Sequence, residues 1–469
     1  MKIKPSFAPS LLAWSLILLS GCSLQPAYHR PAMPVPAQWQ EGQQSGDADS
    51  STDWKKFYRD RRLVNLIQLA LENNRDLRVA ALNVESAQAQ FRIERSALFP
   101  TIEANMNKTS ERVPANLYST RSTGAATYQQ YELSAGITSW ELDFFGRIRS
   151  LRDNALETYL ATAATEQATR ISLIASVATG YMSLAADHDL LRLATETADS
   201  QKNTWLLTQR KYLGGNGVVS EQDVMQAEMS VRSAEADVEK YTRQLKQDEN
   251  ALSLLLGVPL PASVKQNMTL ENYVGFPSVK AGMPSDLLTR RPDIIAAEHT
   301  LKAANANIGA ARAAFFPSIS LTASGGSLSD SLGHLLEGGT AGWSFLPEIN
   351  IPIFTGGKNE ANLDVAKLEK RIEIANYEKS IQQAFEEVSD ALAGKETYSK
   401  EVAARIKDLD ANKRYYGLAL QRYQAGVDSH LNVLVAQREL YSSEEDVISV
   451  KLASLQQDIT LYKVLGGGW

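Results

Sequence analysis

The stretch RIRSLRDNALETYLATAATEQATRISLIASVATGYMSLAADHDLLRLATETADSQKNTWLLTQRKY, residues 147–212, decides the fold of this chain of 469 residues. It contains no proline, which would break a helix, and only one glycine, Gly180. Residues 357–422 likewise contain no proline. At about 1.5 Å per residue, each stretch predicts one helix of roughly 100 Å. Because helices of globular domains average about 11–12 residues, such long helices must pack lengthwise against others, as in coiled coils.

The segments that follow these stretches supply the packing partners. Ser220–Leu256 and Leu431–Leu465 are predicted to be helices that run back antiparallel to the long ones. Ser220 and Asp223 form the Ser-x-x-Asp pattern of a helix start, with an acid near the positive end of the helix. Each half of the chain therefore predicts an antiparallel helical hairpin.

Four segments show the period-two alternation of apolar and polar residues that is typical of β-strands, two within 100–146 and two within 317–356. Their connections at 108–127 and 325–341 are rich in Gly, Ser and Thr and are predicted to be exposed loops. The chain is thus predicted to contain four strands beside its helices. The alternating apolar residues are Ile102, Ala104 and Met106; Tyr131, Leu133, Ala135 and Ile137; Ile319, Leu321 and Ala323; and Ile349, Ile351 and Ile353.

The two halves of the sequence resemble each other. Residues 74–77 (NRDL) and 97–100 (ALFP) match residues 291–294 (RPDI) and 314–317 (AFFP) at the same spacing. Such ordered matches predict an internal duplication with one plan in each half: a helix, two strands, a long helix and a returning helix. We therefore divide the chain into a signal peptide (1–21), a lipidated N-terminal segment (22–55), a first structural repeat (56–275) and a second structural repeat (276–469).

The N-terminus has the pattern of a bacterial lipoprotein signal. Lys2 and Lys4 precede an apolar run, Leu11–Leu19, which is shorter than the roughly 20 residues of a spanning helix. A Leu-Ser-Gly-Cys lipobox then leads to Cys22, the only cysteine in the chain. We predict that the Cys22 thiol is acylated. Because Ser23 rather than an aspartate follows the cysteine, the pattern resembles that of lipoproteins sorted to the outer membrane. A chance cysteine behind an ordinary cleavage site is the alternative.

Four strands are too few to close a barrel, for which about eight are needed. Strands in lipid must close, because an open edge leaves backbone groups without hydrogen bonds. Several chains must therefore share one barrel: two would give about eight strands and three about twelve. Aromatic residues at the strand–helix junctions fit a girdle at the membrane interface or, alternatively, plugs between helix and sheet. They are Phe99, Trp140, Phe144, Phe145, Phe315, Phe316 and Phe354.

Composition and motifs argue against several other classes of function. A formal net charge of −6, without basic runs, makes a nucleic-acid partner unexpected. The five histidines are scattered and form neither a His-Glu-x-x-His motif nor a Cys/His metal spacing. We therefore expect no enzymatic activity, no metal site and no cofactor besides the lipid on Cys22.

Longer blocks of sequence resemble the TolC family of outer-membrane efflux channels, in the lipoprotein branch that contains OprM and CusC. The blocks are the lipobox at Cys22, Glu141–Gly146 (ELDFFG), Arg290–Ile294 (RRPDI), Ala303–Pro317 (AANANIGAARAAFFP) and Leu465–Trp469 (LGGGW). The resemblance implies an α+β membrane protein, a homotrimer with a twelve-stranded β-barrel (four strands per chain) in outer-membrane lipid and a long antiparallel α-helical coiled-coil tunnel in the periplasm. It also implies a passive exit duct for drugs and other small toxic compounds, docked to a periplasmic adaptor protein and an RND-type inner-membrane pump.

The same resemblance suggests a gate at the periplasmic end of the tunnel, where polar links hold the channels of this family shut. It implies that Arg422 and Tyr423 tie inner to outer helices and that Leu431 is an apolar constriction. Asp223 and Asp428 lie in the matching turns and are candidate partners of Arg422.

One position of the candidate gate departs from the family pattern. Where relatives carry an acid in a Leu-Asp-Ala-Gln run, this chain has Val435. Val435 would give an apolar constriction in place of a ring of carboxylates. For all six candidate gate residues, ordinary helix caps and solvated turns are the alternative interpretation.

Two other functions stay open at this point. A duct of the same architecture could export copper or silver ions, although eight methionines without paired clusters give this no support. A structural lipoprotein that spans the periplasm without a pore is the second alternative. Such a spacer would have no use for strands placed in both repeats.

Overall fold

A computed structural model describes the chain in two compact units, which we treat separately. The first is built from the described parts of Met1–Pro31, Val84–Thr162 and Ala297–Tyr377, and the second from those of Ala32–Asn83, Ala163–Ala296 and Glu378–Trp469. The predicted signal peptide, Cys22 and Trp469 lie outside the described residues. Those residues are 23–39, 53–114, 125–214, 219–262, 264, 268–270, 273, 275–279 and 281–467.

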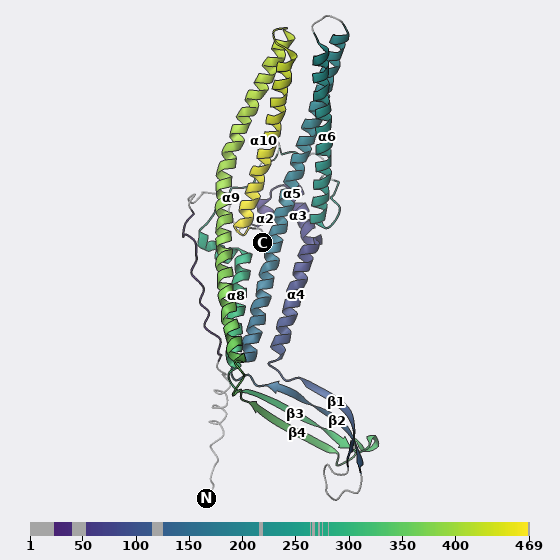
Figure 1. Cartoon of the computed structure of the whole chain (residues 1–469), viewed down its shortest axis with the longest axis vertical. Helices are drawn as coiled ribbons and strands as arrows, with labels where there is room; N and C mark the ends of the chain where they lie inside the picture. Colours follow the sequence, from purple (N-terminus) through teal and green to yellow (C-terminus); the bar gives the residue numbers. More distant parts are fainter. Residues whose placement is uncertain are drawn as a thin grey trace. The chain divides into compact units, whose positions relative to one another are not determined.

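The same order of elements occurs in both halves of the chain (Figure 1). The first half contains α2 (Trp54–Phe57), α3 (Arg61–Asn73), α4 (Arg75–Ser96), β1 (Ile102–Val113), β2 (Ala126–Glu141), α5 (Arg147–Leu213) and α6 (Glu221–Leu256). The second contains η1 (Pro284–Asp286), α7 (Leu287–Arg290), α8 (Pro292–Ala313), β3 (Ser318–Ser329), η2 (Leu332–His334), β4 (Ala341–Asn350), α9 (Lys358–Gln424) and α10 (His430–Val464). Helices α5 and α9 have 67 residues each, which confirms the two long helices and the α+β class. The exact segment boundaries drawn from the sequence stay predictions.

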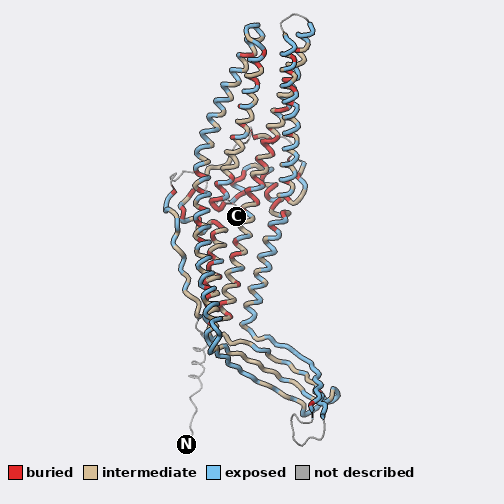
Figure 2. Tube along the Cα trace, in the orientation of Figure 1, coloured by how far each residue is buried: buried red, intermediate tan, exposed pale blue. Residues whose placement is uncertain are grey.

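The first unit contains one antiparallel sheet with the strand order β1-β2-β3-β4. Its register places apolar residues of neighbouring strands opposite each other, as with Met106 and Leu133 or Ala323 and Phe345. Because side chains alternate between the two faces of a sheet, one face is apolar across all four strands and the other is mainly polar. Most strand residues are exposed or half-buried (Figure 2). The predicted alternation is thus confirmed.

An irregularity in β2 keeps this apolar face continuous. The register with β3 shifts between Ile137 and Trp140, where Ser139 has a positive φ of 39°. The N–H of Ser139 donates to Thr322 Oγ1 at 3.2 Å. A one-residue slip reverses every side chain, so the extra residue is what keeps Trp140 on the side of its partner Leu321.

The strands are longer than the sequence predicts. β1 continues to Val113 and β2 begins at Ala126, so both ends of the loop predicted for 108–127, residues 108–113 and 126–127, are paired strand. β3 likewise continues to Ser329, which shortens the loop predicted for 325–341. These residues are mostly polar or small, with Val113 and Leu328 as exceptions, so their sequence shows no regular alternation. The backbone ladder does not require alternation.

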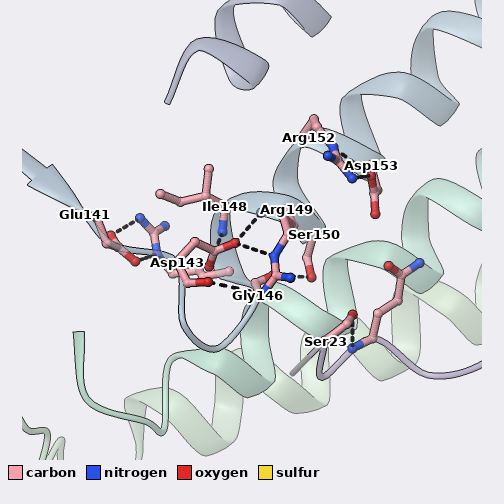
Figure 3. A network of polar contacts seen from close by, with 11 residues as sticks. Ser23, Glu141, Asp143, Gly146, Ile148, Arg149, Ser150, Arg152 and Asp153 are labelled. Atoms are coloured by element: carbon pink, nitrogen blue, oxygen red, sulfur yellow. Dashed lines mark hydrogen bonds and ion pairs between the residues drawn. The ribbon is translucent and has the colours of Figure 1, made fainter. Parts of the chain in front are cut away.

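The turn from β2 into α5 is fixed by the two acids of the ELDFFG block (Figure 3). The Asp143 carboxylate accepts the backbone N–H groups of Ile148 (3.2 Å) and Arg149 (3.0 Å), which have no partner within the first turn of α5. Glu141 accepts two hydrogen bonds from the Arg147 guanidinium, at 2.8 and 2.5 Å. The strand therefore passes into the long helix through a short turn, residues 142–146, and both acids of the block are paired.

The aromatic residues at the strand–helix junctions differ in their surroundings. Phe145 and Phe316 stack with their ring centres 4.8 Å apart, although Phe316 is also exposed. Phe354 is 90% exposed and Phe99 is also exposed, as an interfacial girdle requires.

The second unit has an aromatic core beside α2 and α3, where buried residues gather (red in Figure 2). Phe57 stacks on Tyr462 of α10 with ring centres 3.9 Å apart, and Phe276 also stacks on Phe57, at 5.2 Å. Tyr58 packs edge-on against Tyr462. Aromatic burial of this kind fixes the end of α10 to the short helices.

The long helices return as hairpins. Arg405 and Lys395 of α9 form ion pairs with Asp446 and Asp458 of α10, at 3.0 and 3.4 Å. Partner numbers rise along one helix as they fall along the other, so the pair is antiparallel, as predicted. Among the described residues, no helix combines the length and the apolar character needed to cross a membrane.

Gly257 offers a test of how α6 ends. It has a φ of 69°, and a side chain there would collide with the carbonyl oxygen of Asn73. Gly257→Ala should therefore lower the free energy of unfolding by about 1–2 kcal/mol from the left-handed backbone, with the collision in addition. Gly417→Ala is the matched control, because Gly417 lies within α9 with open space around it, and alanine favours a helix.

Thermal unfolding of the purified protein, followed by circular dichroism, measures both variants. The midpoint should fall for Gly257→Ala and stay equal or rise for Gly417→Ala. An unchanged midpoint for Gly257→Ala would contradict the packing of α6 against the turn between α3 and α4.

Candidate functional site

The candidate gate residues lie where the long helices turn back. We call this region, the last turns of α5 and α9 and the first turns of α6 and α10, the hairpin tip. Arg422 donates to the Asp428 carboxylate from Nε at 2.7 Å and from Nη2 at 3.2 Å. The hydrogen bond from Arg422 lowers the pKa of Asp428, and the Arg422 pKa is raised in return. Both residues belong to one turn, so this ion pair closes the α9–α10 hairpin.

Asp223 is committed to a different contact. Its carboxylate accepts the backbone N–H and the hydroxyl of Ser220, at 2.8 and 2.7 Å, and its own N–H donates to Ser220 Oγ at 3.2 Å. The backbone hydrogen bond, followed by that from the hydroxyl, lowers the pKa of Asp223. The two residues form the predicted capping box of α6. The carboxylate partner of Arg422 is therefore Asp428, not Asp223.

Tyr423 provides a contact between the two hairpins. The Lys211 ammonium of α5 lies 5.3 Å from the centre of the Tyr423 ring, within the range of a cation–π interaction. The ring of His430, the first residue of α10, lies 5.1 Å from the same ring. One aromatic side chain thus touches residues from both hairpins.

The two candidate constriction residues lie on α10. Leu431 is 51% exposed, and Val435 is half-buried one turn further along. Their spacing of four residues places both on one face of the helix. This face belongs to the hairpin tip but takes no part in its polar contacts.

A second candidate region lies at the N-terminus, where residues 23–31 run along α8. We call these residues the N-terminal strap. Arg312 donates to the carbonyl oxygen of Leu24 at 3.1 Å, and Asn305 donates to that of Pro26 at 2.8 Å. Because these bonds use the strap's backbone, they hold its path along α8 whatever its side chains.

Charge and close packing complete the attachment of the strap. Arg30 pairs with Glu298 at 2.7 Å, and Lys302 also contacts Glu298. Burial raises the pKa of Glu298, but the hydrogen bonds from Arg30 and Lys302 leave it below its ordinary value. A Cβ on Gly309 would lie only 3.0 Å from Gln25 Cα, so glycine lets the strap approach the helix closely.

Comparison with known proteins decides the family. The family model described as outer membrane efflux protein matches residues 66–258 and 283–467. The chain belongs to the outer membrane efflux protein family. The match covers most of both predicted repeats.

Individual relatives of this outer membrane efflux protein are similar over nearly its whole length. The toluene efflux pump outer membrane protein TtgC of Pseudomonas putida is 47% identical over 98% of this chain and 95% of its own. The antibiotic efflux pump outer membrane protein ArpC of Pseudomonas putida has the same identity and coverage. The solved open state of the Neisseria gonorrhoeae MtrE outer membrane channel matches with a TM-score of 0.87 and 38% identity, over 95% of this chain and 98% of that one.

Family membership settles the general function. The protein is an outer-membrane efflux channel that extends into the periplasm, in a family of ducts rather than enzymes. The alternative of a structural lipoprotein without a pore is therefore dropped.

Two expectations about bound groups stay predictions. One is the acylation of Cys22, which lies outside the described residues. The other is the absence of any further cofactor. Within the described part of the chain, no three or more His, Cys, Asp or Glu side chains are placed together to hold a metal ion.

The sequence alone gives no role to two residues of the hairpin tip, Lys211 and His430. Lys211 contacts Tyr423 from another helix, α5, and His430 contacts it across the turn between α9 and α10. The one signal available for His430 is its position directly after a predicted turn, where a histidine has no obvious role as a cap.

The capping box at Ser220 can be tested against a matched site. Ser220→Ala should cost the start of α6 about 1 kcal/mol, because the hydrogen bond to the Asp223 N–H is lost. Ser429→Ala is the control, since Ser429 precedes α10 in the same position but makes no capping hydrogen bond through its side chain. Hydrogen exchange in the first turn of each helix should speed up for Ser220→Ala only. Equal behaviour of the two variants would argue against the capping box.

Proposed function

We propose that three copies of the chain form one channel, with twelve strands closing a barrel in the outer membrane and the helices forming a periplasmic tunnel. The sheet carries this proposal. One of its faces is apolar across four strands, and β1 and β4 each have only one neighbouring strand. In lipid, each unpaired backbone group would cost several kcal/mol. Pairing β4 of one copy with β1 of the next removes every edge.

Exposed apolar residues on the helices also support neighbouring copies. Val365, Leu368 and Ile372 are exposed and, at spacings of three and four, lie on one face of α9. Leu82 and Ile93 are exposed on α4. Adjacent copies would remove these stripes from water.

The N-terminal strap supports the lipid anchor. Leu24 is bound by Arg312, one residue before α8 ends at Ala313, and β3 begins shortly afterwards at Ser318. The strap therefore holds the chain next to Cys22 at the level where helix meets sheet. A lipid on Cys22 would enter the membrane beside the barrel.

The names of the relatives support a proposal for the exported compounds and for the partner proteins. TtgC is a toluene efflux pump protein and ArpC an antibiotic efflux pump protein. By analogy, this chain would pass small apolar toxic compounds, delivered by an RND-type inner-membrane pump and a periplasmic adaptor protein. Export of copper or silver ions is the alternative cargo.

Gene deletion tests the cargo directly. Cells without the gene should become severalfold more susceptible to toluene and to apolar antibiotics, and a plasmid copy should restore resistance. Growth in copper and silver salts should not change. Sensitivity to the metal salts alone would support the alternative cargo, and no change under any condition would contradict a role in efflux.

We infer further that the hairpin tip is the closed end of the resting channel. The Arg422–Asp428 pair holds the α9–α10 turn, and Tyr423 holds that turn against α5 through Lys211. Asp223 shapes the start of α6. Leu431 and Val435 would then narrow the lumen with apolar side chains.

Charge reversal tests this gate. Arg422→Glu places a carboxylate beside Asp428 and should open the turn, raising the resting conductance of the channel in planar bilayers. Arg405→Glu is the matched control, because it breaks a similarly exposed ion pair, with Asp446, further along the same hairpin. Its conductance should equal that of the wild type. Unchanged conductance of Arg422→Glu would remove Arg422 from the gate.

A further inference from the structure

His430 is an unusual residue for its position. It begins α10 directly after the turn that contains Asp428, where most residues are exposed, yet only 6% of its surface is accessible. Its Nδ1 atom is buried and has no hydrogen-bond partner among the described residues. A buried polar atom of this kind lowers the stability of the folded protein. It therefore calls for an explanation, such as a function or a partner gained in another state.

Groups from both hairpins face the His430 ring. Tyr423 of α9 packs against it, with ring centres 5.1 Å apart. The Lys211 ammonium of α5 lies 5.3 Å from the centre of the same Tyr423 ring. Asp223 at the start of α6 and Lys211 are the charges that act on the imidazole. The Arg422–Asp428 pair lies in the adjoining turn and neutralises itself.

These surroundings favour a neutral imidazole. Burial lowers the pKa of His430; Asp223 acts in the opposite direction, and Lys211 adds to the lowering. A proton on the ring would therefore be a charge withdrawn from water, on a side chain whose Nδ1 has no hydrogen-bond partner among the described residues, and Asp223 offsets only part of this cost.

We propose that His430 makes the hairpin tip sensitive to protons, so that acid loosens the contact between the two hairpins and opens the channel. The proposal rests on the tip being the closed end of the resting channel. In the packed tip the ring is held neutral, whereas a loosened tip lets it enter water and bind a proton. The contribution of the neutral ring to this packing is fully present above the ordinary pKa of histidine, about 6.5. It is lost as the pH falls through the lowered pKa of His430.

Single-channel recording in planar bilayers tests the proposal. The wild-type open probability should rise severalfold between about pH 7.5 and about pH 5. His430→Phe keeps an aromatic ring against Tyr423 and His430→Gln keeps a polar side chain, but neither can be protonated in this range. Both should show the wild-type open probability at the higher pH and little change at the lower one.

His188→Gln is the matched control. His188 lies in α5, away from the hairpin tip, and also has a buried ring nitrogen without a partner among the described residues. This variant should keep the full response to acid. A wild type without an acid response, or a response that survives in both His430 variants, would overturn the proposal. A protein that forms no channels at either pH would instead overturn the proposed function.

Discussion

Backbone hydrogen bonding at the two edges of the sheet is the constraint on which the rest of this protein depends. Water can satisfy an open strand edge, whereas lipid cannot. A chain with four strands and a continuous apolar face therefore needs the edges of other copies. Details within the strands serve that face, including the bulge that keeps Trp140 beside Leu321.

The long helices extend from the sheet and are the part of the chain that would form the efflux tunnel. Asp143 starts α5 directly after β2, so this long helix follows the strand pair through a short, fixed turn. The N-terminal strap binds the end of α8 near the same junction, so the proposed lipid on Cys22 would enter the same membrane as the sheet. In the proposed gate, a few contacts centred on Tyr423 would hold the hairpin tip closed.

The features that depend on one element alone could be predicted from the sequence. The long helices follow from the absence of proline, the apolar face from period-two alternation, and the capping box from Ser220 and Asp223. Strand ends could not be located, because residues 108–113 and 325–329 show no regular alternation of apolar and polar residues. The partner of Arg422 and the role of His430 depend on how two turns and two hairpins approach in space, which spacing along the chain does not record.

The number of copies in one particle tests the central claim most directly, because every edge of the sheet must be paired in lipid. The full-length acylated protein, extracted from membranes in mild detergent, can be weighed by native mass spectrometry. A particle of three chains is the expected result, and it should persist when the concentration is lowered. A stable particle of one chain would contradict the shared barrel and the channel built on it.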